Sequence, residues 1–260
     1  MDNATTVRRR DAVTLLNKVP EVTLLFWVVK ILSTTVGETA ADFLADDVGL
    51  GLTTTSLLMA VLLGDALVIQ FRTRRYVPWV YWLSVVLISI VGTLISDNLV
   101  DNLGVSLWTT TIAFAVCLAV TFVIWYRSER TLSIHTIVTR RRETFYWLAI
   151  LFTFALGTSA GDLVSEQLAL GYLTAAVIFG AVIGAVTLAY YAGANAVLTF
   201  WVGYVLTRPF GASIGDLLTA DPGDGGLGLG TNTVSAVFLL VILACVGWFT
   251  VQDRRVPAGA

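Results

Sequence analysis

The sequence predicts an all-α integral membrane protein with eight transmembrane helices, arranged as four parallel two-helix repeats with both termini in the cytoplasm. Three observations support this prediction: an apolar composition, eight apolar runs, and a pattern of residues that occurs four times. Of the 260 residues, 57% are hydrophobic and 13% are charged, and the mean hydropathy is +0.82. Soluble domains are much less apolar. The net charge of −2 argues against nucleic acid as a partner, because no excess of basic residues is present. The apolar composition instead predicts the lipid bilayer as the partner.

Each apolar run is about 20 residues long, which is the length that an α-helix needs to cross a bilayer. The runs are continuously apolar rather than alternating, and this favours helices over the strands of a barrel. In chain order they cover residues 21–41, 53–71, 78–96, 105–126, 144–161, 171–191, 196–215 and 232–250.

An aromatic–Trp pair, a glycine and an aspartate recur at constant spacing. In every copy the glycine follows the tryptophan by ten residues and the aspartate follows it by fifteen. The four copies are Phe26-Trp27 with Gly37 and Asp42, Tyr81-Trp82 with Gly92 and Asp97, Tyr146-Trp147 with Gly157 and Asp162, and Phe200-Trp201 with Gly211 and Asp216. The recurrence predicts a single membrane domain, residues 1–260, built by duplication. Its repeats cover approximately residues 19–76, 77–130, 140–192 and 193–252.

The polar segments between the runs separate by charge. Basic residues occur at both termini and in every second link: Arg8–Arg10, Lys18, Arg72, Arg74, Arg75, Arg127, Arg130, Arg140–Arg142, Arg254 and Arg255. The other links carry acidic residues instead: Asp46, Asp47, Asp101, Glu166, Asp221 and Asp224. The positive-inside rule then predicts a multi-pass protein of the cell membrane with both termini in the cytoplasm. Each repeat is one outward and one returning helix, so the four repeats are parallel rather than inverted.

Each glycine of the pattern is followed four residues later by another small residue. The pairs are Gly37/Ala41, Gly92/Ser96, Gly157/Gly161 and Gly211/Gly215. A spacing of four places both members on one helix face, where they allow two helix backbones to approach closely. We therefore expect the first helices of the repeats to pack against each other or against their repeat mates at the outer end.

The four repeated aspartates fall at the outer boundary of the hydrocarbon. At 1.5 Å per residue, Asp42 lies ~32 Å from the start of the first helix and Glu38 lies ~26 Å from it. Two roles are open for the aspartates: each caps its external link, or together they form a mouth that attracts cations. The two roles are compatible. Glu38 and Asp42, one turn apart, are the best candidates for metal ligands.

Ionisable groups deeper in a bilayer are costly and usually functional. Asp65 lies on the second helix ~10 Å from the inner side, and Lys30 and Arg208 fall near the midplane. Arg208 precedes Pro209, which interrupts helix hydrogen bonding. Either the two bases form internal salt bridges with Glu38 or Asp65, or they handle a solute. Hydroxyl side chains accompany these charges: Ser33, Thr34, Thr35, Thr39, Ser89, Thr93, Thr153, Thr158, Ser159, Thr207 and Ser213.

The four tryptophans of the pattern, Trp27, Trp82, Trp147 and Trp201, lie ~22 Å from their aspartates, near the inner interface. Anchoring in that interface is the ordinary role of tryptophan at this depth. The alternative is that they line a shared inner vestibule.

Three stretches resemble a family of uncharacterised bacterial and archaeal membrane-anchored proteins that carry four tandem two-helix repeats of unknown function. They are Val19-Pro20-Glu21-Val22, Thr35-Val36-Gly37-Glu38-Thr39-Ala40-Ala41-Asp42 and Gly157-Thr158-Ser159-Ala160-Gly161-Asp162. The resemblance runs from Lys18 through the last apolar run. It implies two transmembrane segments and a characteristic tryptophan in each repeat, and it implies no catalytic residue.

These observations favour a transporter or permease for a small cation, with a divalent metal ion or a proton-coupled ion as candidates. Hard cations prefer oxygen ligands, and the chain offers carboxylates, hydroxyls and carbonyls without a His/Cys set. The repeated aspartates would gather the ion, and Glu38 and Asp65 would form a deeper site or a proton relay.

Two other functions remain open. One is a carrier for a small organic solute or an anion that Lys30 and Arg208 bind. The other is a non-transporting membrane scaffold or sensor, and a homo-oligomer is compatible with all three. We expect no enzymatic activity and no cofactor, because no nucleophile–base pair, metal triad or cofactor loop is visible.

Overall fold

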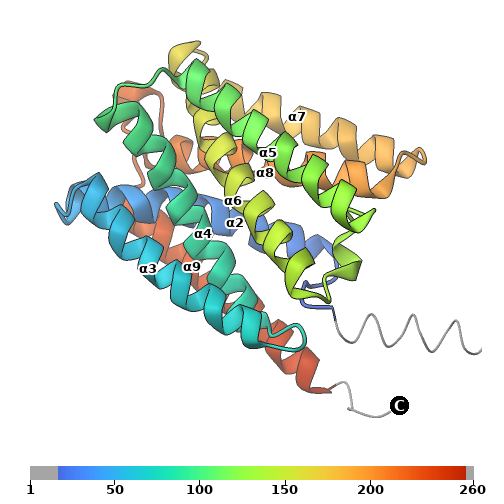
Figure 1. Cartoon of the computed structure of the whole chain (residues 1–260). Coiled ribbons are helices and arrows are strands. Elements are labelled where there is room, and N and C mark those ends of the chain that lie inside the picture. Colours follow the sequence, from blue (N-terminus) through green and yellow to red (C-terminus); the bar gives the residue numbers. More distant parts are fainter. Residues whose placement is uncertain (1–16, 256–260) are drawn as a thin grey trace, which may run out of the picture.

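The computed structural model describes residues 17–255, apart from the side chains of residues 166, 224 and 253–255. Arg8–Arg10 lie outside the described residues. Within this range the chain is all-helical, as predicted, and each long helix matches one apolar run (Figure 1). The helices are α2 (Leu24–Asp42), α3 (Leu52–Arg72), α4 (Pro78–Asp97), α5 (Leu107–Glu129), α6 (Arg140–Asp162), α7 (Tyr172–Tyr191), α8 (Ala196–Thr219) and α9 (Thr231–Arg255).

Seven of these helices are long and apolar enough to cross a membrane by length and composition. The exception is α8, so the expectation of eight such helices is met only in part. Arg208 and Pro209 interrupt the apolar sequence in the middle of α8. α8 packs against α2, α6 and α7, and Thr207 and Arg208 are buried among these helices, whereas Asp216 is only half-buried.

Four helices form an inner ring. α2 packs against α4 and α8, and α6 packs against the same two helices, so the ring is closed. In the most apolar stretch of each helix, 61–72% of the residues are buried in α2, α4 and α6, compared with 17–22% in α3, α5, α7 and α9. The first helix of every repeat is therefore internal and the returning helix is external.

Each returning helix packs on the inner helix of the next repeat rather than on that of its own. α3 packs on α4, α5 on α6 and α7 on α8, and α9 completes the circle by packing on α2 (Figure 1). The last repeat thus covers the first one. The repeats are interlocked, because each inner helix is covered mainly by the returning helix of the preceding repeat.

Side-chain caps and a proline set the starts of several helices. A side-chain oxygen at the N-cap accepts a backbone N–H bond of the first turn in α2, α5, α6 and α8, and α4 begins with Pro78. Such caps satisfy N–H groups that have no partner inside the helix. At their other ends α2, α4 and α6 terminate at the repeated aspartate, and a π-helical turn follows: Phe43–Asp47, Asn98–Asn102 and Leu163–Gln167. α8 has no such turn and continues to Thr219.

The repeated glycines are the close-contact points of the inner ring. A Cβ built on Gly92 would lie 2.6 Å from the Cβ of Phe154, closer than real side chains pack. Every glycine meets the residue that stands three positions before the glycine of the next helix: Gly37 meets Ser89, Gly92 meets Phe154, Gly157 meets Arg208 and Gly211 meets Thr34. Of the two packings that the small-residue pairs allowed, the structure shows that of the first helices against each other, with equivalent residues at the four interfaces.

Candidate functional site

The four repeated aspartates lie together. They line one pocket of about 340 Å³ at the end of the inner ring where α2, α4 and α6 terminate. Seven of the eleven residues that line it are acidic: Glu38, Asp42, Asp46, Asp97, Asp101, Asp162 and Asp216, beside Leu52, Val100, Leu107 and Tyr172. Asp42 is exposed and Asp97 is half-buried, so water reaches both carboxylates. Duplication has therefore gathered equivalent carboxylates about a common axis.

Capping does not account for this arrangement. The side chains of Asp42 and Asp97, at the junctions with the π-helical turns, make no capping hydrogen bond to the following backbone. For these two aspartates the capping interpretation is wrong. Their carboxylates are directed instead to the shared pocket, where their charges add to one another.

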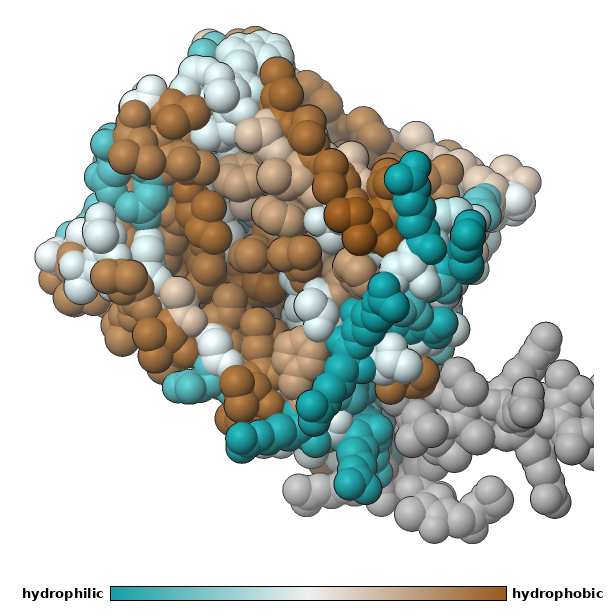
Figure 2. Space-filling view, in the orientation of Figure 1, coloured by the Kyte–Doolittle hydropathy of each residue, from teal (hydrophilic) through white to brown (hydrophobic). Residues whose placement is uncertain are grey.

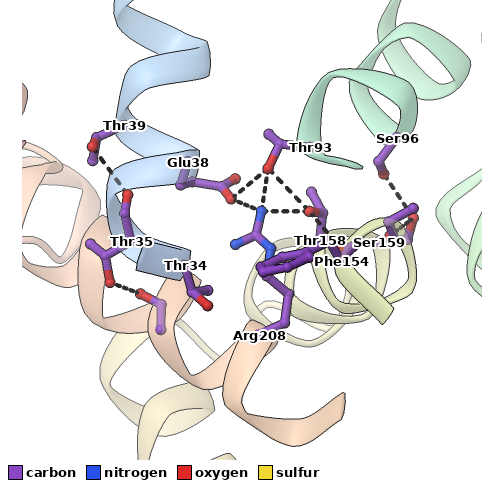
Figure 3. Close-up of polar contacts among 12 residues, drawn as sticks. Thr34, Thr35, Glu38, Thr39, Thr93, Ser96, Phe154, Thr158, Ser159 and Arg208 are labelled. Carbon is purple, nitrogen blue, oxygen red and sulfur yellow. Dashed lines mark hydrogen bonds and ion pairs between the residues drawn. The ribbon is translucent and has the colours of Figure 1, made fainter. Parts of the chain in front are cut away.

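Glu38 forms the floor of the pocket and is joined there to Arg208. The Nη2 atom of Arg208 forms an ion pair with Glu38 Oε2 and donates hydrogen bonds to Thr93 and Thr158, the latter over 2.6 Å (Figure 3). The hydroxyl of Thr93 also donates to Glu38 Oε2 over 3.3 Å. One guanidinium of α8 therefore holds the other three inner helices together.

The acceptors of Arg208 occupy one position of the repeat. Glu38, Thr93 and Thr158 each follow the glycine of their copy directly, and Ala212 stands there in the fourth copy. Ala212 has no polar group, and the base of α8 comes from one turn earlier in the same helix. The sequence suggested both threonines only as members of a hydroxyl stripe, and alignment of the repeats is the signal that singles them out.

The guanidinium of Arg208 is fully buried, and two of its nitrogens, Nε and Nη1, have no hydrogen-bond partner among the described residues. Lys30 lies on the same ring axis and is also buried. Its Nζ donates to Thr34 Oγ1 over 3.3 Å and stands 4.0 Å from the centre of the Phe154 ring and 4.4 Å from that of Tyr204. Aromatic faces attract a cation but do not neutralise it. Of the two predicted salt-bridge bases, Arg208 thus pairs with Glu38, and Lys30 forms no ion pair in the described structure.

The structure does not bring Asp65 to the site. Its carboxylate is exposed on α3, an outer helix. The buried face of α3 contains Met59, Leu63 and Ala66, which follow the helical period toward α4. Asp65 lies outside that face, so the expected pairing of Asp65 with Glu38 as a deeper site is not what the fold provides.

Three of the four tryptophans of the pattern are buried inside the bundle, which is not the position of an anchor at a lipid interface. Trp82, Trp147 and Trp201 are only 1–4% exposed, and Trp27 is half-buried. In every repeat the aromatic residue before the tryptophan packs on the tryptophan of the neighbouring repeat. The ring centres are 5.6 Å apart for Phe26–Trp82, 5.6 Å for Tyr81–Trp147, 6.2 Å for Tyr146–Trp201 and 5.6 Å for Phe200–Trp27. We call these eight residues the aromatic ring, and they close the end of the inner bundle opposite the acidic pocket.

A second buried ion pair lies at that closed end, and the sequence did not suggest it. Lys18 Nζ donates to Glu143 Oε2 over 2.6 Å and to the Phe71 carbonyl over 3.3 Å. Gln70 Nε2 donates to the other carboxylate oxygen of Glu143 over 3.1 Å. This cluster joins the segment before α2 to α3 and α6. Glu143 directly follows Arg140–Arg142 near the start of α6. Its predicted position is therefore at the membrane surface, where a charged residue does not indicate a functional site.

Across the described residues, no group of three or more His, Cys, Asp or Glu side chains is arranged to hold a metal ion. The suggested pair of metal ligands, Glu38 and Asp42, therefore has no third His, Cys, Asp or Glu ligand arranged with it among the described residues, and one oxygen of Glu38 already accepts from Arg208. The pocket suits a hydrated cation that is attracted by summed charge better than a tightly chelated one.

Comparison with known proteins assigns the family. The model of a Repeat of Unknown Function (DUF347) matches four stretches of the chain, residues 25–76, 80–131, 145–194 and 199–255. No curated protein and no solved structure matches the chain. The four matches cover most of the sequence and coincide with the interlocked helix pairs, and the chain therefore belongs to the DUF347 repeat family, of which it contains four tandem copies.

Proposed function

We propose that this protein is a transporter of small cations in the cell membrane, with eight spanning helices, both termini in the cytoplasm and the acidic pocket at the external face. Support for the membrane placement comes from the seven apolar helices and from the surface. Figure 2 shows a broad hydrophobic face over the outer helices, with hydrophilic residues gathered along the edge where α3 and α5 end and α6 begins. That edge carries exposed Arg74, Arg130 and Arg141, as the positive-inside rule requires of a cytoplasmic side.

The observation that carries the transport proposal is the convergence of four equivalent aspartates on one pocket above a carboxylate–guanidinium pair. A cleft that is lined by one sign of charge concentrates ions of the opposite sign. Cations would collect among the aspartates and then meet Glu38 at the floor. There the cation competes with Arg208 for the same carboxylate.

Competition at Glu38 gives the pocket a gate. While Arg208 holds Glu38, Thr93 and Thr158, it ties α8 to the other three inner helices and places a positive charge on the path. A cation that binds Glu38 releases Arg208, and the inner helices lose their common tie. Passage further requires that the aromatic ring separates, because its side chains fill the opposite end of the bundle.

Flux through reconstituted vesicles tests the proposal. The purified protein is placed in proteoliposomes and challenged with Na⁺, K⁺, Mg²⁺ and Mn²⁺, with a pH dye inside to report coupled protons. Glu38→Gln should lower the uptake of the transported cation at least tenfold. Asp65→Asn is the matched control, since its carboxylate is exposed on α3 and distant from the pocket lining, and it should leave uptake unchanged. Unaltered uptake in the Glu38→Gln protein would refute the gate.

One observation favours the second candidate, a carrier of anions or small carboxylates. Two bases, Lys30 and Arg208, are buried in the inner bundle, and of the two only Arg208 forms an ion pair in the described structure, with Glu38. Two of the guanidinium nitrogens of Arg208 have no partner there. An anion between these bases would satisfy both. In that case Lys30→Met and Arg208→Met should abolish carboxylate uptake, whereas Asp97→Asn should have little effect. The opposite ranking of these variants supports the cation transporter.

A further inference from the structure

A second cavity lies on the outside of the bundle, between the C-terminal part of α5 and the N-terminal part of α8. Its volume is about 700 Å³. α5 packs on α6, and α7 packs on α8. The cavity lies between α5 and α8, and residues of both helices line it. The walls are apolar and consist mainly of Phe122, Leu198, Trp201, Val202 and Val205. We call this cavity the α5–α8 groove.

The groove has an apolar body and a basic mouth. Along α8 it extends from Val197 to Leu206, which is about 14 Å at the rise of a helix, or roughly half of the hydrocarbon thickness. Arg130, Thr131 and Asn195 line its end at the basic edge of the molecule. The dimensions and the polarity therefore match one leaflet of a bilayer, with acyl chain in the body and head group at the mouth.

The polar groups at the mouth are available to an anion. Glu129, the nearest acid in sequence, is paired with Arg142 over 2.8 Å and with Arg141 over 3.6 Å. Arg130 is exposed, and the described residues hold no ion pair to it. Asn195 accepts two backbone N–H bonds through Oδ1 at the start of α8, and its amide Nδ2 remains able to donate. A guanidinium and an amide donor at one site suit the oxygens of a phosphate.

We propose that the α5–α8 groove binds one acyl chain of an anionic phospholipid, with the phosphate at Arg130 and Asn195. A net negative head group is favoured over a zwitterionic one, because Arg127, also exposed, stands one turn before Arg130 and adds a second positive charge. This inference depends on the membrane placement proposed above but not on ion transport.

The bound acyl chain would contact the aromatic ring, which closes the inner end of the proposed transport path. Trp201 forms part of the groove wall and belongs to the aromatic ring as well. Its ring centre is 4.9 Å from that of Phe122 on α5 and 5.8 Å from that of Tyr204, whose ring faces Lys30. Lipid in the groove thus supports the position of Trp201 from outside and links the cytoplasmic leaflet to the aromatic ring.

Lipid binding to the purified full-length protein in detergent tests this proposal without any flux measurement. Native mass spectrometry and thermal unfolding are recorded with dioleoyl phosphatidylglycerol, with dioleoyl phosphatidylcholine and with inorganic phosphate. The wild-type protein should bind the phosphatidylglycerol at least tenfold more tightly than the phosphatidylcholine, and inorganic phosphate should not raise the melting temperature. Equal binding of the two lipids, or equal stabilisation by phosphate alone, would overturn the assignment.

Two variants locate the site. Arg130→Gln should reduce the preference for phosphatidylglycerol to nearly onefold, while Arg74→Gln, an exposed base of the same edge outside the groove, should preserve it. Val202→Trp should fill the groove and remove the bound lipid. If Arg130→Gln retains the full preference, the groove is not the site, and this conclusion holds even if the bulky variant fails to fold. Because lipid binding is measured without flux, unaltered transport in Glu38→Gln with lipid binding intact would refute only the transport proposal. Loss of transport in Glu38→Gln without any lipid preference in the wild-type protein would refute only this inference.

Discussion

Arg208 of α8 reaches across the inner ring to Glu38 of α2, and Thr93 and Thr158 complete the same cluster (Figure 3). Three of the four copies of the repeat thus provide an acceptor from one position, and the remaining copy provides the donor. The Arg208–Glu38 ion pair is therefore asymmetric, although the four inner helices around it come from equivalent repeats. The cluster therefore depends on the substitutions that distinguish the copies as well as on the position that they share.

The first prediction concerns the stability of this pair. Removal of one partner from a buried ion pair leaves an uncompensated charge and typically costs about 3–5 kcal/mol. Glu38→Gln should therefore lower the melting temperature in detergent, and the double variant Glu38→Gln/Arg208→Met should recover part of the loss. A double-mutant cycle checks the coupling, and strictly additive effects of the two changes would show that the two side chains do not interact.

The second prediction concerns the close contacts of the glycines. Gly92→Ala would place a methyl group 2.6 Å from the Cβ of Phe154 and should destabilise the protein by about 1–3 kcal/mol, the usual cost of overpacking. Gly64→Ala on α3 is the control, because nothing lies within 4 Å of its added Cβ. Alanine also has the higher helix propensity, by about 1 kcal/mol, so this variant should be neutral or stabilised. Similar thermal unfolding of the two variants would contradict the close approach of α4 and α6.

The third prediction concerns the field of the acidic pocket. Asp42→Asn combined with Asp97→Asn should reduce cation uptake, because two of the converging charges are removed. The difference from wild type should be largest at low ionic strength, since exposed charges are screened beyond about 8 Å at physiological salt. The check is to compare initial rates at about 10 mM and about 500 mM of an impermeant electrolyte, where the Debye length is about 30 Å and less than about 8 Å, respectively. A salt-independent difference would point to direct ligation instead.

The fourth prediction concerns the aromatic ring. Trp147→Ala should lower the free energy of unfolding by about 3–5 kcal/mol, as expected for loss of a large buried side chain. Trp108→Ala is the matched change at a tryptophan of α5 that is 51% exposed, and it should have a much smaller effect. Denaturation in mixed micelles followed by circular dichroism compares the two. Equal losses would mean that Trp147 lies at the surface.

The sequence alone determined the helices and the repeat. The eight apolar runs, the constant spacing of tryptophan, glycine and aspartate, and the small-residue pairs depend only on chain-local properties: helix length, helical period and duplication. The sequence left open whether the four aspartates cap their links or share one mouth. The closed ring of inner helices places them in one pocket, since equivalent positions of a closed repeat array surround one axis. The family that these residues resemble, with four tandem repeats of unknown function, is confirmed by the match to the DUF347 repeat.

Only the tertiary structure decided which faces turn inward. In a bilayer an apolar side chain is equally stable against lipid or against another helix. The pattern of apolar residues, which marks the buried face of a helix in water, therefore does not distinguish inner faces from lipid-facing ones in a membrane protein. For that reason the sequence could not show that Asp65 faces outward, or that Trp82 and Trp147 are internal rather than interfacial. The choice of Glu38 rather than Asp65 as the partner of Arg208 depends on the packing of each returning helix on the next repeat, a long-range arrangement that no local spacing encodes.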